Sequence, residues 1–257
     1  MSARSSWLER TRKPFAETVR RWDLSTAAVT VRARPLSPEE AIGNPGRRDY
    51  PLLKGRERLI EARIGTARGH AFSDAPREFT GSLRAVLELP LDNTRDRGIY
   101  VATLNAVLNH CGEIDRTVHC RDDEPERCAQ VIAENLKRRW ERVGLIGLNP
   151  AIADELIRCF GPDRMRLTDL DPDNVGARRS GVPVWDGRKE YEKLIRSSDG
   201  VMVTGTAFVN GTFDAIWHVL RQYNRPFILY GVTASGIAHL FKFEHLCPFA
   251  GTSSGRG

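Results

Sequence analysis

The sequence of 257 residues lacks an apolar run of about 20 residues, the length that a membrane-spanning helix requires. Its first residues also lack the apolar core of a secretory signal peptide. We therefore expect a cytoplasmic protein that makes no contact with a membrane. The hydrophobic content of 40% and the charged content of 28% are typical of globular proteins with a buried core.

Motifs that identify common enzyme classes are also missing. There is no Gly-x-x-x-x-Gly-Lys phosphate loop and no Gly-x-Ser-x-Gly nucleophile turn. The dinucleotide fingerprint is absent because Asn149-Pro150 follows the strand predicted at 142–148, where a glycine-rich turn would be needed. NAD is therefore not expected as a cofactor. Whether the protein catalyses any reaction stays open.

The five cysteines form no Cys-x-x-Cys pair, and their odd number indicates reduced thiols rather than a disulfide framework. His119 and Cys120, with Cys128, are the candidate ligands of a transition metal ion, because imidazole and thiolate bind such metals. His119 and Cys120 precede a predicted helix, whose dipole would lower the pKa of the thiol. The alternative for Cys128, as for Cys111, is an inert position in the apolar stripe of a helix.

Positive charge is concentrated at one end of the chain. The formal net charge is +6, and residues 1–34 contain eight Arg or Lys against three Asp or Glu, a balance of 8 − 3 = +5. The rest of the chain has no interleaved basic and aromatic run of the kind that stacks nucleic-acid bases. A nucleic-acid partner is therefore not expected, and a solvated basic helix is the alternative. The oligomeric state stays open.

The pattern of apolar residues divides the chain into three parts. Residues 1–50 are basic and rich in turns, and we expect a peripheral arm there. Residues 51–120 predict an α+β unit with a strand at 59–65 and a helix at 99–110. In residues 121–257 strands predicted at 142–148, 165–170, 201–203 and 226–230 alternate with helices, one of them over 211–223, and a polar connection runs from the second strand to Trp185. This alternation predicts a parallel sheet covered on both faces. The expected fold class is α/β.

Polar side chains follow the predicted strands of this sheet. The carboxyl ends of parallel strands converge on one edge, where open α/β sheets bind their ligands. The candidate ligand-binding residues are Asn149, Asp169, Asp171, Thr204, Thr206, Asn210, Thr212 and Thr233. Hydroxyl and amide groups bind a polar small molecule through hydrogen bonds. Ordinary helix capping is the alternative for the Thr and Asn residues.

Two stretches resemble a known family. Thr204-Gly-Thr-Ala-Phe-Val-Asn-Gly-Thr212, followed by Ile228-Leu-Tyr-Gly-Val-Thr-Ala234, resembles the C-terminal domain of the putative heavy-metal-chelation proteins. Gly98-Ile-Tyr-Val-Ala-Thr-Leu-Asn-Ala-Val107 is similar to the Ala-x-x-Asn-Ala helix in the N-terminal domain of that family. The resemblance covers roughly residues 55–250. It implies an α+β domain like the N-terminal domain of enolase, followed by a Rossmann-like domain.

The resemblance also implies a site in the cleft between these domains. There we expect the binding of a heavy or transition metal ion, or of a small molecule that carries a metal. The alternative is an enzyme that acts on a nucleotide-like or corrin-like substrate at the carboxyl edge of the parallel sheet.

Overall fold

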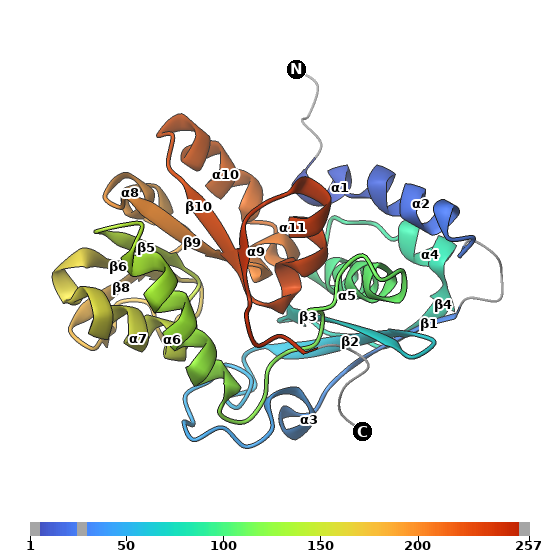
Figure 1. Ribbon diagram of the computed structural model, residues 1–257, viewed down its shortest axis with the longest axis horizontal. Helices are drawn as coiled ribbons and strands as arrows, with labels where there is room; N and C mark the ends of the chain where they lie inside the picture. Colours follow the sequence, from blue (N-terminus) through green and yellow to red (C-terminus); the bar gives the residue numbers. More distant parts are fainter. Residues whose placement is uncertain (1–5, 25–29, 252–257) are drawn as a thin grey trace.

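The computed structural model describes residues 6–24 and 30–251. They form two β-sheets with helices packed around them (Figure 1). The first sheet has four strands in the order β3-β2-β1-β4, and all of its pairs are antiparallel. The second has seven strands in the order β11-β10-β9-β5-β6-β8-β7. The expected α/β fold class is confirmed. Among the described residues, no helix combines the length and apolarity that crossing a membrane requires.

The first sheet carries helix α5 on one face. Its strands are β1 (Thr30–Pro35), β2 (Arg58–Ile64), β3 (Ala67–Ser73) and β4 (Phe79–Ser82). Helix α5 (Thr94–His110) lies very close to β3 because Gly69 has no side chain. A Cβ atom at Gly69 would lie 2.2 Å from the backbone nitrogen of Ala106. Three helices cover α5 from the side away from the sheet (Figure 1), namely α1 (Trp7–Arg10), α2 (Arg12–Arg21) and α4 (Leu83–Leu87).

The segment 1–50 is not a peripheral arm throughout, which corrects the expectation from its composition. Strand β1 pairs with both β2 and β4 inside the first sheet. Phe15 on α2 is fully buried and packs edge-on against Tyr100 of α5, with ring centroids 5.5 Å apart. Basic composition did not reveal this, because the few apolar residues of the segment do the packing. The division of the chain near residue 120, and the likeness of its first part to enolase, stay predictions.

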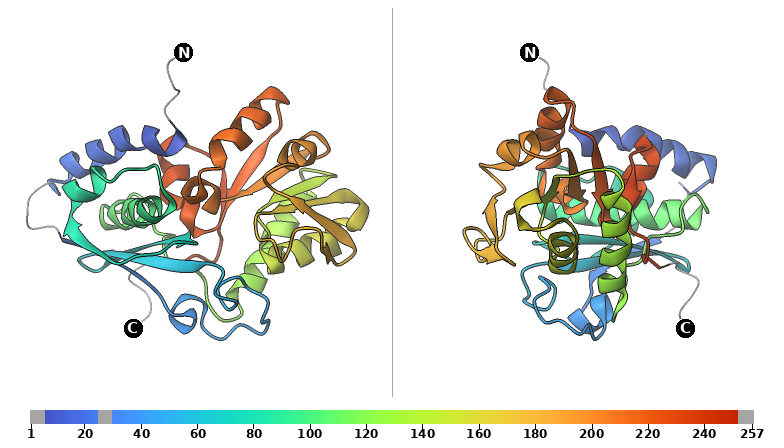
Figure 2. Two further views of the ribbon diagram at one scale, coloured as in Figure 1. Left: turned by 180° about the vertical axis from the view of Figure 1, so that it is seen from behind. Right: turned by 60° about the vertical axis from the view of Figure 1, so that its left-hand side comes forward.

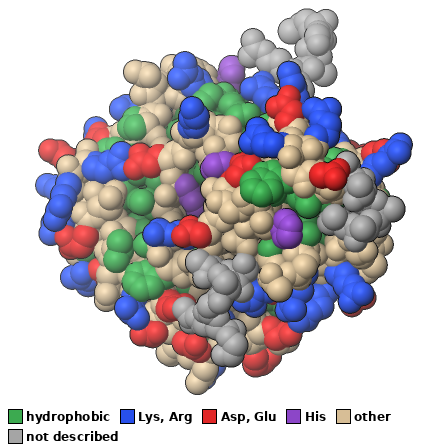
Figure 3. Space-filling view, turned by 45° about the vertical axis from the view of Figure 1, so that its right-hand side comes forward, with side chains coloured by type: hydrophobic (Ala, Val, Ile, Leu, Met, Phe, Trp, Pro, Cys, Tyr) green, Lys and Arg blue, Asp and Glu red, His purple; other side chains and the backbone are tan. Residues whose placement is uncertain are grey.

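Part of the basic charge of this segment holds the fold together. Arg12 pairs with Glu9 and donates from Nη2 to the carbonyl oxygen of Leu89, 2.7 Å away. On the face shown in Figure 3, Lys and Arg side chains lie among Asp and Glu side chains. At least Arg12, among the basic residues of this segment, thus contributes to the packing of the fold.

The second sheet is parallel except for the pair β7–β8. Its strands are β5 (Val143–Ile146), β6 (Met165–Asp169), β7 (Arg178–Arg179), β8 (Val182–Asp186), β9 (Gly200–Thr204), β10 (Phe227–Tyr230) and β11 (His245–Leu246). The pattern predicted β5, β6, β9 and β10. It missed β8, which lies in a segment expected to be a polar connection, because only alternate residues of this strand are buried.

Helices cover both faces of the second sheet (Figure 2). Its helices are α6 (Glu124–Lys137), α7 (Pro150–Phe160), α8 (Tyr191–Arg196), α9 (Thr206–Asn210), α10 (Phe213–Gln222) and α11 (Ser235–Phe241). Helices α6 and α7 pack together on one face, and α8 and α10 pack together on the other. The helix expected over 211–223 is preceded by the short α9, because Gly211 adopts a left-handed conformation with φ of 80° and ends it.

One buried amide connects the two sheets. Asn105 of α5 is fully buried, and its Nδ2 donates to the carbonyl oxygens of His70 in β3 and Val232 after β10, over 2.9 and 3.1 Å. Its Oδ1 accepts from the backbone nitrogen of Gly236 in α11 at 2.7 Å. Asn105 is the asparagine of the Ala-x-x-Asn-Ala motif. The motif therefore fixes the position of the first sheet relative to the second.

The change Asn105→Ala should lower the free energy of unfolding by about 2–4 kcal/mol, because it leaves buried backbone groups without partners. Chemical denaturation measures this. The matched change Asn135→Ala, at an exposed position of α6, should cost less than about 0.5 kcal/mol. Equal losses in the two variants would contradict the role of Asn105.

Candidate functional site

A cavity of about 550 Å³ lies between the two sheets, where β5, β6, β9 and β10 end. This volume suits a small organic ligand. All of the residues that the sequence singled out line it: Asn149, Asp169, Asp171, Thr204, Thr206, Asn210, Thr212, Thr233, His119, Cys120 and Cys128. The segment leading into β2 and the end of β3 contribute Glu57, Phe72 and Asp74. The cavity between the two sheets therefore lies at the carboxyl edge of the parallel sheet, where the polar residues were expected to meet.

Asp169 fixes the turns at this edge. Its carboxylate accepts hydrogen bonds from the backbone nitrogens of Leu148, Leu170 and Asp171, over 2.8, 2.6 and 2.8 Å. Burial raises the pKa of Asp169, and these N–H groups oppose that effect by stabilising the charged form. Because both of its oxygens already accept hydrogen bonds, Asp169 mainly holds the cavity wall in place and has little capacity left for a ligand.

Asn149 and Asn210 each use the oxygen of the amide for the fold. Asn149 caps α7 by accepting from the backbone nitrogen of Ile152 at 3.1 Å. Asn210 accepts from the backbone nitrogen and the hydroxyl of Thr212, at 3.1 and 2.8 Å. Within the described residues neither Nδ2 group has a hydrogen-bond partner. Capping and ligand binding therefore do not exclude each other here, because they use different atoms.

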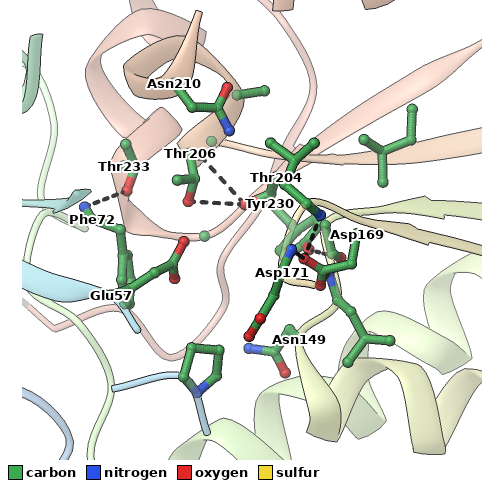
Figure 4. A pocket seen from close by; sticks show the side chains of 18 of the residues that line it. Glu57, Phe72, Asn149, Asp169, Asp171, Thr204, Thr206, Asn210, Tyr230 and Thr233 are labelled. Carbon is green, nitrogen blue, oxygen red and sulfur yellow. Dashed lines mark hydrogen bonds between the residues drawn. The ribbon is translucent and has the colours of Figure 1, made fainter. Parts of the chain in front are cut away.

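The threonines differ in how much hydrogen-bonding capacity remains. Thr233 Oγ1 accepts from the backbone nitrogen of Phe72 at 3.0 Å and so ties β3 to the loop after β10. Thr204 donates to the hydroxyl oxygen of Thr206 at 3.2 Å. The hydroxyl of Thr206 is therefore still available to donate a hydrogen bond. Figure 4 shows these side chains together on one side of the cavity, opposite Asn149 and Asp171.

Glu57 is the residue that sequence reasoning missed. Its carboxyl group points into the cavity (Figure 4) and forms no hydrogen bond or ion pair within the described part of the chain. Burial, together with the nearby carboxylates of Asp169, Asp74 and Asp171, raises the pKa of Glu57 to about 7. Glu57 stands between Arg56 and Arg58, so in sequence it reads as part of a solvated charged linker. No local signal distinguishes it.

His119 lies in the cavity wall as a neutral ring. It packs edge-on against Phe72, with centroids 5.2 Å apart, and its Nδ1 lies 3.2 Å from the carbonyl oxygen of Ala41. Burial lowers the pKa of His119 to about 4, and the neighbouring His70 acts in the same direction. The ring is therefore uncharged at neutral pH, and one of its nitrogens already faces a backbone oxygen.

The thiols differ from expectation. Burial raises the pKa of Cys120 well above its usual range and that of Cys128 to about 11. The expected lowering for Cys120 is wrong, because α6 begins only at Glu124 and Cys120 lies in a buried stretch before it. Cys128 does lie in the buried stripe of α6, as the alternative proposed.

His119, Cys120 and Cys128 line one cavity without forming a ligand set. Among the residues that the structure describes, no group of three or more His, Cys, Asp or Glu could hold a metal ion. Protonated thiols are poor metal ligands, because the thiolate is the binding form. The geometry therefore does not support the predicted coordination by these three residues, and the donor set does not fit a directly bound heavy metal.

Comparison with known proteins confirms the resemblance seen in the motifs. Residues 130–245 match the model of a family described as putative heavy-metal chelation. The family description thus connects this part of the chain with heavy metals, although no metal site accompanies it among the described residues. No curated protein matches the sequence.

Two solved structures from the same family are similar to this chain, and both are proteins of unknown function. The one from Pyrococcus horikoshii has 13% sequence identity and a TM-score of 0.51, over 89% of this chain and 80% of that one. The one from Desulfitobacterium hafniense DCB-2 has 15% identity and a TM-score of 0.47, over 72% of each chain. At such low identity the first likeness shows the fold alone.

In the native protein, Cys159 should react with iodoacetamide roughly tenfold or more faster than Cys120, because only Cys159 is partly exposed. Peptide mapping after a brief pulse measures both rates. In denatured protein the two rates should become similar. A native Cys120 that labels as fast as Cys159 would disprove the burial argument.

Proposed function

We propose that the protein binds a small polar molecule that carries a metal, and that it holds this molecule in the cavity between the sheets through hydrogen bonds. One observation carries the proposal. Three hydrogen-bonding groups of the cavity lining, Asn149 Nδ2, Asn210 Nδ2 and the Glu57 carboxyl, have no partner among the residues that the structure describes. The family description supplies the connection to heavy metals.

The chemistry of the lining favours a complete metal complex over a bare ion. A bare ion needs several charged or basic ligands at short distances around one point. His119 and the buried thiols do not supply them, for the reasons given above. A complex whose coordination shell is already filled needs only hydrogen-bond partners on its outside, and amides, hydroxyls and carboxylates provide these.

The number of free groups sets the expected affinity. A neutral hydrogen bond contributes about 0.5–1.5 kcal/mol, and one to a charged group about 1.5–3 kcal/mol. Two neutral bonds and one charged bond then give roughly 2.5–6 kcal/mol, before any apolar contact with Phe72 or Ile152 is added. Dissociation constants in the millimolar to micromolar range correspond to about 4–8 kcal/mol. Weak binding is therefore expected for a ligand that uses only these groups.

A second candidate function is an enzyme acting at the same edge of the sheet. The pKa of Glu57, raised to about 7, favours it, because a general acid or base works best near the ambient pH. A nucleotide-like substrate fits less well than a corrin-like one, since its phosphates would lie among the carboxylates of Glu57, Asp74 and Asp171. Turnover that is lost in Glu57→Gln while binding persists would support this candidate.

Equilibrium dialysis with substitution-inert cobalt(III) complexes tests the proposed binding. Their ligands do not exchange, so any retention reports contacts to the outside of the complex. The panel consists of hexaamminecobalt(III), tris(glycinato)cobalt(III) and hexacyanocobaltate(III). We expect retention of at least one complex at one per chain. If none is retained, or if Zn²⁺ alone binds stoichiometrically and is lost in a His119→Ala, Cys120→Ser double variant, the proposal fails.

The change Asn210→Ala should weaken the binding of tris(glycinato)cobalt(III) by roughly several-fold to a hundredfold, because it removes the free Nδ2 donor that the carboxylate oxygens of this complex can accept from. The same dialysis measures the affinity, and Asn135→Ala serves as a control with unchanged affinity. Thermal melting distinguishes this role from the alternative that Asn210 only supports its loop. In that case Asn210→Ala would melt lower and yet bind with the affinity of the original protein.

A further inference from the structure

Negatively charged groups dominate the lining of the cavity. Four carboxylates line it: Glu57, Asp74, Asp169 and Asp171. Two arginines also line it, but Arg56 forms an ion pair with Asp173, and Arg188 donates to the carbonyl oxygen of Leu170 at 3.2 Å. Both arginines are exposed, so solvent weakens their effect on the interior.

The carboxylates are not equivalent. Asp169 accepts from backbone nitrogens at both of its oxygens, and Asp171 Oδ1 accepts from the backbone nitrogen of Asp173 at 3.0 Å. Asp74 is exposed. Glu57 is partly buried and has no partner within the described residues, so it is the carboxylate whose charge is least compensated.

A second unpaired group lies in the same lining. Thr168 of β6 is fully buried, and its Oγ1 has no hydrogen-bond partner in the part of the chain that the structure describes. Buried hydroxyls without a partner are uncommon in folded proteins. The Thr168 hydroxyl and the Glu57 carboxyl are thus two groups of the cavity lining whose hydrogen bonds the fold does not satisfy.

We propose that the cavity selects a cationic ligand, namely a positively charged metal complex whose outside carries N–H or O–H groups as well as acceptor atoms for the Nδ2 donors of Asn149 and Asn210, and that the Glu57 carboxylate binds its positive charge. This inference rests on the proposed function and specifies its ligand class. Glu57, Asp171 and the hydroxyl oxygens would accept hydrogen bonds from the complex. Charge-assisted bonds of this kind are stronger than neutral ones, and more so away from bulk water.

Binding of a cation beside Glu57 should depend on pH. The charged and titratable groups around Glu57 are Asp74 after β3, Asp169 and Asp171 at and after β6, the adjacent Arg56, and Tyr230 of β10. Because burial, together with the neighbouring carboxylates, raises the pKa of Glu57 to about 7, part of Glu57 is protonated at neutral pH. A bound cation favours the ionised form. Affinity for a cation should therefore rise by about tenfold between pH 6 and pH 8, and binding should release a proton.

The same three cobalt(III) complexes test the charge preference, at equal ionic strength. The chain as a whole has a net charge of +6, so general attraction would favour the anionic hexacyanocobaltate(III). The cavity predicts the opposite order, with hexaamminecobalt(III) bound most tightly and hexacyanocobaltate(III) least. Anion binding that equals or exceeds cation binding would overturn this inference and leave the proposed function standing. Failure of all three complexes to bind would overturn both.

The variant Glu57→Gln keeps the shape of the side chain and removes its charge. It should weaken hexaamminecobalt(III) by about tenfold to a hundredfold at pH 8 and abolish the rise in affinity between pH 6 and pH 8. Affinity for neutral tris(glycinato)cobalt(III) should change much less. Glu17→Gln, the same change at an exposed position of α2, is the control and should behave like the original protein. An unchanged pH profile in Glu57→Gln would contradict the role of Glu57.

Discussion

The arrangement of this protein depends on the three hydrogen bonds of one buried amide. Asn105 is located on the helix that covers the first sheet, and it binds β3, the turn after β10 and the first residues of α11. Gly69 and Gly236 allow this contact, since a side chain at either position would collide with α5 or with the amide itself. Because the cavity lies between the same two sheets, its shape is a direct result of this connection.

Residues around the cavity divide their polar atoms between the fold and the interior. In Asn149 and Asn210 the oxygen stabilises a helix or loop, whereas the amide nitrogen has no hydrogen-bond partner among the described residues. Thr233 and Asp169, by contrast, are held by backbone N–H groups. Thr233 and Asp169 therefore hold the walls of the cavity in position, whereas the amide nitrogens of Asn149 and Asn210 remain available to a ligand. Walls that are already held by hydrogen bonds need little further ordering when a ligand binds, which reduces the entropic cost of binding.

Burial explains why the metal-binding residue types behave differently from their usual chemistry. Cys120 and Cys128 are kept protonated and His119 is kept neutral, because a charged form would be poorly solvated in this wall. The same effect raises the pKa of Glu57, where neighbouring carboxylates add to it. Burial therefore brings the pKa of Glu57 close to neutral pH, whereas it moves the pKa values of the two thiols and of His119 away from it.

The sequence by itself determined the α/β class, four strands of the second sheet and the edge at which the polar residues meet. It could do so because strand and helix periodicity are local, and because parallel strands must end together. It also pointed to Asn105 through a motif, without showing its role. Only the tertiary structure decided the place of β1 inside the first sheet, the burial of Cys120 and the position of Glu57. These depend on interactions between residues far apart in the chain, for example the electrostatic effect of Asp169 on Glu57, and such interactions leave no periodic pattern in the sequence.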